Sequence, residues 1–391
     1  MKLVDKLKCL LVIGCFATTV NANDGAFYMS GNQLVPINET RISVQKEILT
    51  IKAIPCTQEY CRDKLSITVY YEFFNPDNDK TLLVGFEAPS PAGDAETEPK
   101  NGAHPYIYDF KVEMNNKAIP HKIHFVPNSL YYKDGKINET KDIVIADGWT
   151  NFNYVYSFNA PFKKGINTVK HTYTFEMSGS VDFAYWYNYI LTAANRWGNK
   201  QIDDFTLIID MGQFKDFYIS DSPFGEQVAA NWKINGKGWM SQSIENANTP
   251  VREDEEINTS ITATHFFIQY GEIELKIKNF QPKDELVLYS YNPILIDMDG
   301  DGIGTEYDGL FDHETYNLFF DQLPDYTSAR NELAKKILYN YPFARRGYVF
   351  TSPKLKKYYQ DQLWYKEDKT YKPEIEKLSK EEQEWIKKWS K

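Results

Sequence analysis

The sequence predicts a mainly β, sandwich-like N-terminal region followed by a small α-helical module at the C-terminus. Three observations support this: apolar residues alternate at period two over much of residues 23–294, turn residues separate these runs, and helical spacing with capping residues appears after residue 310. The chain has 391 residues, 42% of them hydrophobic, which is enough for two or three folded domains. Its net charge of −10 argues against nucleic acid as a partner.

Residues 1–22 have the pattern of a signal peptide. A basic start precedes a short apolar run, residues 9–17, which ends at a small-residue cleavage site at residues 20–22. Neither this run nor any later one reaches the ~20 apolar residues that a membrane-spanning helix needs. We therefore expect a secreted or periplasmic protein that begins at Asn23. The alternative is a lipoprotein anchored through Cys15, because residues 12–15 resemble a bacterial lipobox.

Two cysteines, Cys56 and Cys61, remain after that cleavage. In an oxidising compartment, cysteines this close in sequence predict a local disulfide that pins a loop. A redox-active pair is the alternative, but that chemistry prefers Cys-x-x-Cys at the start of a helix.

The region 23–294 is predicted to be a β-rich domain. Alternation of apolar and polar residues, or enrichment in β-branched and aromatic ones, marks strands at residues 41–51, 65–73, 109–114, 117–119, 167–175, 205–209 and 266–270. Asn115 and Asn116 predict a hairpin turn, because asparagine tolerates positive φ. Many strands at short spacing favour a sandwich over a β-α-β fold.

Short segments of this domain carry a family resemblance. They are residues 23–25, 31–34, 42–51, 71–75, 85–86, 189–192 and 205–207. Together they resemble an uncharacterised family of secreted bacterial proteins, a domain of unknown function. The resemblance implies export and a β-rich fold, and it implies no activity.

Residues 295–312 form an acidic, Asp-rich linker that predicts a calcium-binding loop. Carboxylates at places 1, 3, 5 and 12 and glycine at place 6 match a 12-residue Ca²⁺ loop. The candidate ligands are Asp297, Asp299, Asp301, the carbonyl of Ile303, Thr305 and Asp308. The expected role of Ca²⁺ is structural, to stiffen the junction between domains. The alternative is a solvated acidic turn, since no entering helix is evident and the twelfth residue is Asp rather than Glu.

The region 313–391 is predicted to be a helical domain. Basic residues outnumber acidic ones here, whereas the preceding region is acidic. Helical spacing from Ala329 predicts a first helix that Pro342 ends, and Ser352-Pro353 opens a second. A capping box at Ser379–Glu382 opens a third.

This domain contains a recognisable motif. The residues that carry it are Asn340, Phe343, Ala344, Arg345, Arg346, Gly347, Tyr348, Phe350, Leu355, Tyr358, Trp364 and Tyr365. They resemble the YARHG domain, a module assigned to extracellular bacterial proteins, over about residues 315–391. Phe343 replaces the tyrosine of the motif and Arg346 replaces its histidine, which removes the one residue suited to metal ligation or proton transfer near neutral pH. We expect a structural motif, with Arg345 bonding backbone carbonyls and Gly347 ending a turn; ligand binding is the alternative.

The sequence holds no convincing catalytic constellation. His121 and His124 would face opposite sides of a strand, which indicates ordinary histidines. Aromatic residues make up 15% of the chain, and Tyr185-Trp186-Tyr187 could be a platform for sugar rings or simply ordinary strand residues. We therefore expect an exported bacterial envelope or secreted, non-catalytic protein with a binding or scaffolding role, whose partner is a cell-surface glycan or an envelope protein. The alternatives are a carbohydrate- or peptidoglycan-binding protein and a hydrolase with an unidentified carboxylate site.

Overall fold

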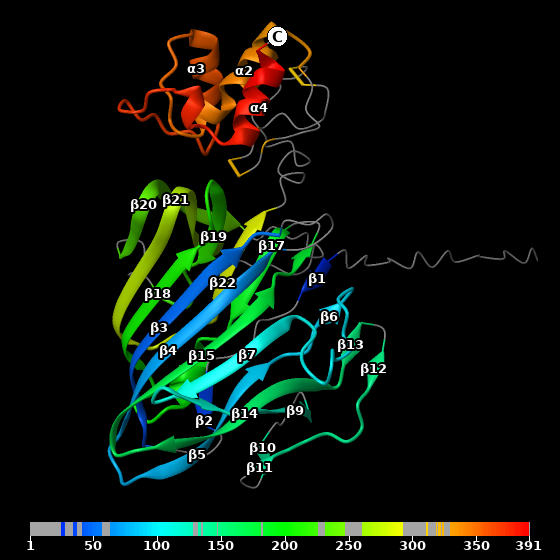
Figure 1. Ribbon diagram of the computed structural model, residues 1–391, viewed down its shortest axis with the longest axis vertical. Coiled ribbons are helices and arrows are strands. Elements are labelled where there is room, and N and C mark those ends of the chain that lie inside the picture. The colour runs from blue at the N-terminus through cyan, green and yellow to red at the C-terminus, as the bar shows by residue number, and fades with distance from the viewer. Residues whose placement is uncertain are drawn as a thin grey trace, which may run out of the picture.

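The computed structural model describes residues 25–27, 34–36, 41–56, 63–127, 132–133, 136–146, 148–180, 183–225, 231–246, 260–291, 310–311, 318, 320–321, 323 and 329–390. In this part of the chain all the strands precede the α-helices (Figure 1). The predicted fold class, a mainly β region plus a small helical module, is confirmed.

A large sheet runs the length of the β region. Among the described residues it has 11 strands, in the order β17-β22-β19-β21-β18-β3-β4-β15-β7-β8, with β20 added to β21. Their bounds are β3 Ser43–Ile54, β4 Lys64–Asn75, β7 Ile107–Met114, β8 Lys117–Ile119, β15 Gly165–Glu176, β17 Phe183–Tyr189, β18 Ile202–Asp210, β19 Lys215–Ser220, β20 Trp232–Asn246, β21 Ser260–Phe280 and β22 Leu286–Tyr291. Strands β3 and β18 pair in parallel, whereas β3 and β4 pair antiparallel.

A second sheet, with four strands in the described part of the chain, packs against one end of the first. It consists of β2 Leu34–Pro36, β5 Lys80–Ala88, β9 Lys122–Pro127 and β14 Phe152–Phe162, in the order β2-β5-β14-β9. Smaller pairings join β1 Gly25–Phe27, β6 Ala92–Gly93 and β16 Gly179–Ser180, and form the hairpins β10 Tyr132–Lys133 with β11 Lys136–Ile137 and β12 Ile145–Ala146 with β13 Trp149–Thr150. A short 3₁₀ helix, η1, covers Thr192–Arg196.

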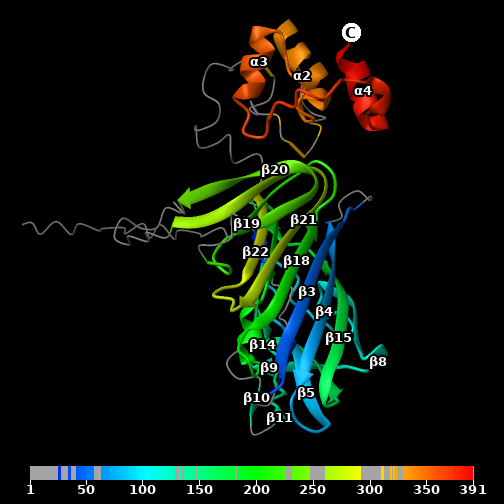
Figure 2. The ribbon, with the colours of Figure 1, turned by 90° about the vertical axis from the view of Figure 1, so that its left-hand side faces the viewer.

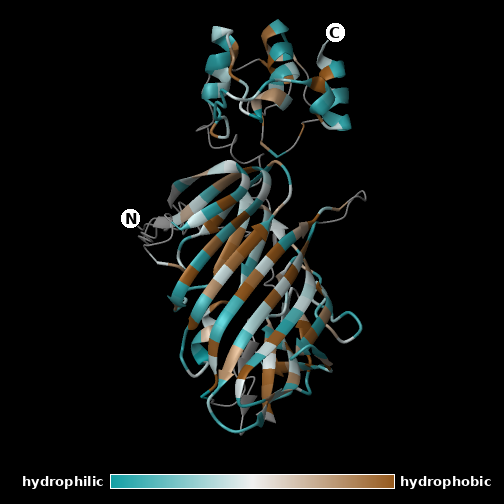
Figure 3. Ribbon diagram, turned by 60° about the vertical axis from the view of Figure 1, so that its left-hand side comes forward, coloured by the Kyte–Doolittle hydropathy of each residue, from teal (hydrophilic) through white to brown (hydrophobic). Residues whose placement is uncertain are grey.

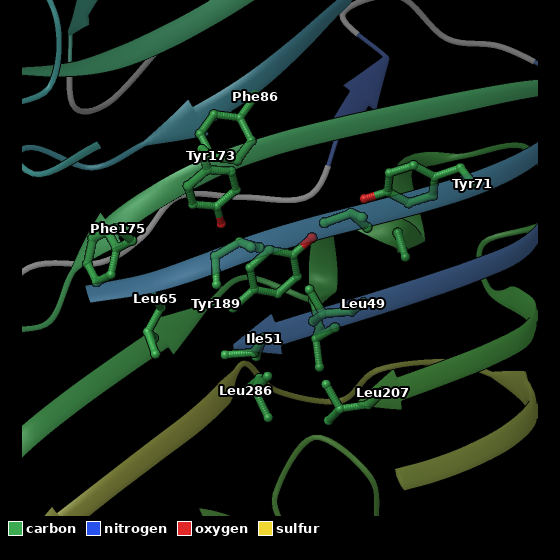
Figure 4. Packing of buried hydrophobic residues seen from close by; sticks show 14 of the residues in the cluster. Leu49, Ile51, Leu65, Tyr71, Phe86, Tyr173, Phe175, Tyr189, Leu207 and Leu286 are labelled. Atoms are coloured by element: carbon green, nitrogen blue, oxygen red, sulfur yellow. The ribbon is translucent and has the colours of Figure 1, made fainter. Parts of the chain in front are cut away.

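The core gathers the inward side chains of both sheets, because each strand turns every second residue to one face. Figure 3 shows this alternation as bands of hydrophobic and hydrophilic residues along the strands. Figure 4 shows Phe86 of the second sheet next to Tyr173 of the first, and their rings pack edge to face with centres 5.1 Å apart. The predicted turn is present, since Asn115 and Asn116 have φ values of 49° and 62°.

The helical module contains α2 Glu332–Ala344, α3 Pro353–Gln360, the 3₁₀ helix η3 Ile375–Lys377 and α4 Lys380–Trp389. It lies beyond the end of the β region formed by β20 and β21 (Figure 2). The capping box at Ser379 is present, because the Glu382 amide donates to Ser379 Oγ at 3.1 Å and the Ser379 amide donates to Glu382 Oε2 at 3.0 Å. None of the helices in the described part of the chain is long and apolar enough to cross a bilayer.

The prediction that Pro342 ends the first helix is wrong. Pro342 lies inside α2, which continues to Ala344. Proline has no amide hydrogen, so it cannot bond the carbonyl of Leu338 four residues earlier. That carbonyl instead accepts a hydrogen bond from Trp385 Nε1 of α4 at 2.6 Å. The partner supplied by a neighbouring helix reduces the cost of proline in the last turn.

Candidate functional site

The motif, which begins in the last turn of α2, holds the helical module together. The guanidinium of Arg346 donates two hydrogen bonds to the Glu382 carboxylate of α4, at 2.7 and 2.8 Å, and a third to the Pro342 carbonyl at 2.7 Å. Burial by itself would raise the pKa of Glu382, but the hydrogen bonds and charge of Arg346 outweigh it and lower that pKa. Arg346, which stands where the motif has histidine, therefore forms an ion pair that joins the end of α2 to α4.

The neighbouring Arg345 joins the module to the sheet. Its buried guanidinium lies 3.9 Å from the ring centre of Phe214, which precedes β19, and 5.4 Å from that of Tyr341. Its carbonyl accepts a hydrogen bond from Gln269 Nε2 of β21 at 3.0 Å. A cation over an aromatic face is attracted to the ring, and the attraction is stronger where water is excluded. Both ends of Arg345 thus contact the β region.

A second link lies beside the first. Lys237 Nζ of β20 donates to Asp368 Oδ2 at 2.6 Å, and this bond holds the pKa of Asp368 well below its usual range. The Asp368 amide in turn donates to the Gly347 carbonyl at 2.8 Å. Gly347 has φ of 88°, and a Cβ there would lie 2.6 Å from the carbonyl oxygen of Lys366. Only glycine fits this turn without displacing the backbone.

We call the contact surface between the β20–β21 end of the sheet and the helical module the junction. Apolar side chains also contribute to it. The rings of Trp239 and Phe267 stack at 5.2 Å, and Phe320 meets both edge-on at 5.6 and 5.7 Å. Phe267 belongs to the same buried cluster as the residues of α2 and α3. Phe267 of the sheet is therefore buried in the apolar core of the helical module.

The other motif residues also make structural contacts. Asn340 Nδ2 donates to the Lys336 carbonyl at 2.7 Å, and Tyr365 Oη donates to the Tyr348 carbonyl at 2.6 Å. Trp364 Nε1 donates to the Leu318 carbonyl. Phe343 packs with Leu378 and Ile386, and Ala344 is buried in the main cluster of the module.

The proposed platform Tyr185-Trp186-Tyr187 is divided between two environments. Tyr187 is fully buried, and Tyr185 packs against the sandwich core. Trp186 instead belongs to a row of rings across β17, β22, β19 and β21, paired in register as Trp186, Tyr289, Tyr218 and His265. The rings of Trp186 and Tyr289 stack at 5.3 Å, and those of Tyr218 and His265 at 3.8 Å.

We call these four residues, together with Phe183 and Tyr291, the aromatic face. Phe183 lies 4.8 Å from Trp186 and 5.2 Å from Tyr291, measured between ring centres. His265 also approaches Phe267 of the junction, at 4.0 Å, so the aromatic face continues into that contact surface. Sequence reasoning missed all of these residues except Trp186, because they come from four strands that only the sheet order brings together.

Several predicted residues lie outside the described part of the chain. These are the signal peptide, Cys61 and the candidate calcium ligands between residues 297 and 308. Cys56 is described, and its amide donates to Asp63 Oδ1 at 2.7 Å. Within the described residues, no group of three or more His, Cys, Asp or Glu side chains is placed to hold a metal ion.

Comparisons with known proteins bear mainly on the C-terminus. No curated protein matches the sequence. Among solved structures, a candidate nutrient binding protein of Legionella pneumophila is 16% identical with a TM-score of 0.47, covering 93% of this chain and 98% of that one. An M1 zinc metallopeptidase of Deinococcus radiodurans is 9% identical with a TM-score of 0.25, covering 65% of this chain and 43% of its own.

Leukotriene A4 hydrolase of Saccharomyces cerevisiae is 8% identical with a TM-score of 0.22, covering 60% of this chain and 29% of its own. None of these likenesses is close enough to carry over a ligand or an activity. The family expected for the β-rich region remains an expectation. The C-terminal match is specific: residues 320–391 fit the family model of the YARHG domain.

Proposed function

We propose that this chain is an exported bacterial envelope or secreted protein with a binding or scaffolding role, in which the helical module is a fixed structural part. The observation that carries this proposal is the use of both motif arginines in contacts within the chain. Arg346 is bonded to Glu382, and Arg345 lies over Phe214. An arginine stays protonated at any physiological pH, so neither residue can act as a general acid or base.

Export is supported by the signal pattern of residues 1–22 and by the YARHG match. Sequencing the N-terminus of the protein recovered from the native bacterium tests it. A start at Asn23 in the periplasmic or culture fraction is the expected result. An acylated start at Cys15 would favour the lipoprotein alternative, and an intact Met1 start in the cytosolic fraction would contradict export.

Carbohydrate or peptidoglycan binding is the second candidate, and the aromatic face favours it. Tryptophan and tyrosine rings stack on the apolar faces of sugars, and Trp186 and Tyr218 are half-buried rather than sealed in the core. In a co-sedimentation assay with purified peptidoglycan, Trp186→Ala should reduce binding at least tenfold. The matched control is Trp149→Ala, which removes an exposed ring from the distant β12–β13 hairpin. Equal binding by wild type and Trp186→Ala would exclude the aromatic face as the glycan site.

The Asp-rich linker supports a further part of the proposal. We propose that Ca²⁺ bound by the carboxylates of Asp297, Asp299, Asp301 and Asp308, with Ile303 and Thr305, stiffens the chain between the β region and the helical module. The proposed disulfide between Cys56 and Cys61 would in the same way fix a loop of the exported protein.

A further inference from the structure

Three polar side chains from separate parts of the β region form a hydrogen-bonded chain. His124 Nε2 of β9 lies 2.8 Å from Ser157 Oγ of β14, and His124 Nδ1 contacts the Glu139 carboxylate, which follows β11. A serine and an acid on opposite nitrogens of one imidazole is the arrangement that activates serine nucleophiles on unrelated folds.

The pairing of β9 with β14 determines this geometry. His124 is directly opposite Val155, two residues from Ser157, and alternation puts all three side chains on one face of the sheet. This face is turned away from the sandwich core, to which the adjacent Tyr156 contributes its ring. His121 packs at 5.0 Å against Phe110 of that core, so the two histidines do face opposite sides.

The segment that carries Glu139 is fastened to the same sheet. The amide of Thr140 donates to the Phe125 carbonyl of β9 at 2.9 Å. Farther along, Asn151 Nδ2 donates to the Asp142 carbonyl at 2.8 Å, and the Val144 amide donates to Asn151 Oδ1 at 3.0 Å. These hydrogen bonds position Glu139 beside the imidazole.

The hydrogen-bond partners determine which tautomer a neutral His124 adopts. A carboxylate can only accept, so the hydrogen of the neutral imidazole lies on Nδ1 and points to Glu139. Nε2 then carries the lone pair and accepts the hydrogen of the Ser157 hydroxyl. The histidine is oriented as a general base toward the serine, the role that the arginines of the junction cannot fill.

We propose that Ser157 is a nucleophile for acyl transfer from small esters, with His124 as its general base and Glu139 as a positioning residue. The expected substrate is small because Ser157 is only 5% exposed. Gly85 of β5, directly opposite Ser157, adds no side chain beside the hydroxyl. Lys122 is opposite Ser157 on the other side and on the same face, where its charge favours a developing oxyanion.

The reaction balances without a cofactor. Ser157 Oγ bonds the ester carbonyl carbon while its proton moves to His124 Nε2. The bond to the leaving alkoxide then breaks, and the alkoxide takes that proton to depart as an alcohol. Water, deprotonated by the same nitrogen, hydrolyses the acyl-serine and restores both groups. This activity goes beyond the proposed binding role and does not depend on the aromatic face.

The test is covalent labelling of the mature full-length protein with a small alkyl fluorophosphonate, mapped by mass spectrometry, together with hydrolysis of p-nitrophenyl acetate. Ser157 should be labelled as fluoride leaves, and His124→Ala should slow labelling by about 100-fold or more, the usual contribution of a general base. Glu139→Gln should have a smaller effect, about tenfold, because this side chain is 60% exposed and water screens its charge. It should also shift the pH profile of labelling.

The matched control is Ser220, which is also 5% exposed but bonds Ser222 Oγ at 2.9 Å instead of a histidine. Ser220→Ala should leave the labelling rate unchanged, and thermal melting confirms that each variant is folded. Labelling of Ser157 no faster than of Ser220, or labelling that survives His124→Ala in a folded protein, overturns the proposal. Peptidoglycan binding is measured for the Ser157→Ala variant as well. If this variant still binds while Ser157 is not labelled in the wild type, the proposed nucleophile is wrong and the proposed binding role stands.

Discussion

Arg346 and Glu382 form a two-bonded ion pair between the end of α2 and the first turn of α4. The side chain of Glu382 is only 5% exposed and that of Arg346 only 18%. Glu382 also accepts a hydrogen bond from the Ser379 amide. One carboxylate therefore completes the capping box of α4 and accepts both hydrogen bonds from Arg346. The motif therefore joins α2 to α4 through a residue that lies 36 positions further along the chain.

Removing the arginine should strongly destabilise the helical module. Arg346→Leu leaves a buried carboxylate without its cation, for which the expected loss is about 3–5 kcal/mol in the free energy of unfolding. Urea denaturation of the full chain, followed by helical circular dichroism, measures it. The control is Lys335→Ala, whose pair with Glu332 is exposed and should contribute less than about 0.5 kcal/mol. If both variants lose the same free energy of unfolding, the pair between Arg346 and Glu382 is not a major source of stability.

Gly347 should not tolerate a side chain. Gly347→Ala combines an unfavourable φ with a contact of 2.6 Å to the Lys366 carbonyl, so we expect a loss well above about 1 kcal/mol. Gly212→Ala is the matched control, because Gly212 has a similar φ of 96° but open space around its Cβ position. The difference between their melting temperatures isolates the clash. If the melting temperatures of the two variants fall equally, the contact between the new Cβ and the Lys366 carbonyl does not destabilise the protein.

Phe214 should control the docking of the helical module on the sheet. Phe214→Ala removes the ring beneath Arg345 and Arg346, which lie 3.9 and 4.6 Å from its centre. Hydrogen exchange should then accelerate in residues 341–350 while the strands far from the junction stay protected. Tyr270→Ala serves as the control, because this ring of β21 is 53% exposed. Unchanged exchange in Phe214→Ala would mean that the remaining contacts are sufficient for docking.

The buried His171 should make stability fall in acid. Its ring is fully buried among Tyr71, Phe86 and Tyr173, and burial lowers its pKa to about 3. In the unfolded chain the pKa returns to about 6.5, so below that pH the unfolded state binds a proton that the folded state excludes. The stabilisation is fully present above pH ~6.5 and decreases by up to about 1.4 kcal/mol per pH unit toward pH 3.

His171→Phe should therefore reduce the pH dependence of unfolding between pH 6.5 and 3, while the similarly buried His104 keeps its own contribution in both proteins. Neither ring nitrogen of His171 has a hydrogen-bond partner among the described residues, so phenylalanine sacrifices no bond seen there. Unfolding free energies of both proteins from pH 4 to 8 provide the measurement. Above pH 7 the difference between the two should be constant. If the unfolding free energies of the two proteins change in parallel over the whole pH range, His171 does not cause the loss of stability in acid.

Calcium should stabilise the mature protein if the Asp-rich linker binds it. Millimolar Ca²⁺ should raise the melting temperature and EGTA should reverse the increase, since extracellular loops of this kind bind at about 10⁻⁴–10⁻³ M. Asp301→Asn should weaken the response, whereas Asp94→Asn, in a different loop, should not. No shift at millimolar Ca²⁺ would exclude the site.

The sequence alone determined the fold class and the position of the helices. Alternation in β3, β4 and β15 and the capping box at Ser379 are local patterns, and a strand or helix start depends mainly on residues close in sequence. The YARHG motif was also visible in the sequence, because its order and spacing are local. Pro342 was misjudged because the bond that compensates for it comes from Trp385, 43 positions further along the printed sequence.

Only the tertiary structure decided what the motif and the isolated polar residues contact. Arg345 meets Phe214, and His124 meets Ser157, because strands and helices far apart in sequence pack side by side. Side-chain spacing along one strand reports which face a residue takes, but not which strand becomes its neighbour. Sheet order and domain docking set those partners, since burial of apolar surface over the whole fold outweighs any local preference.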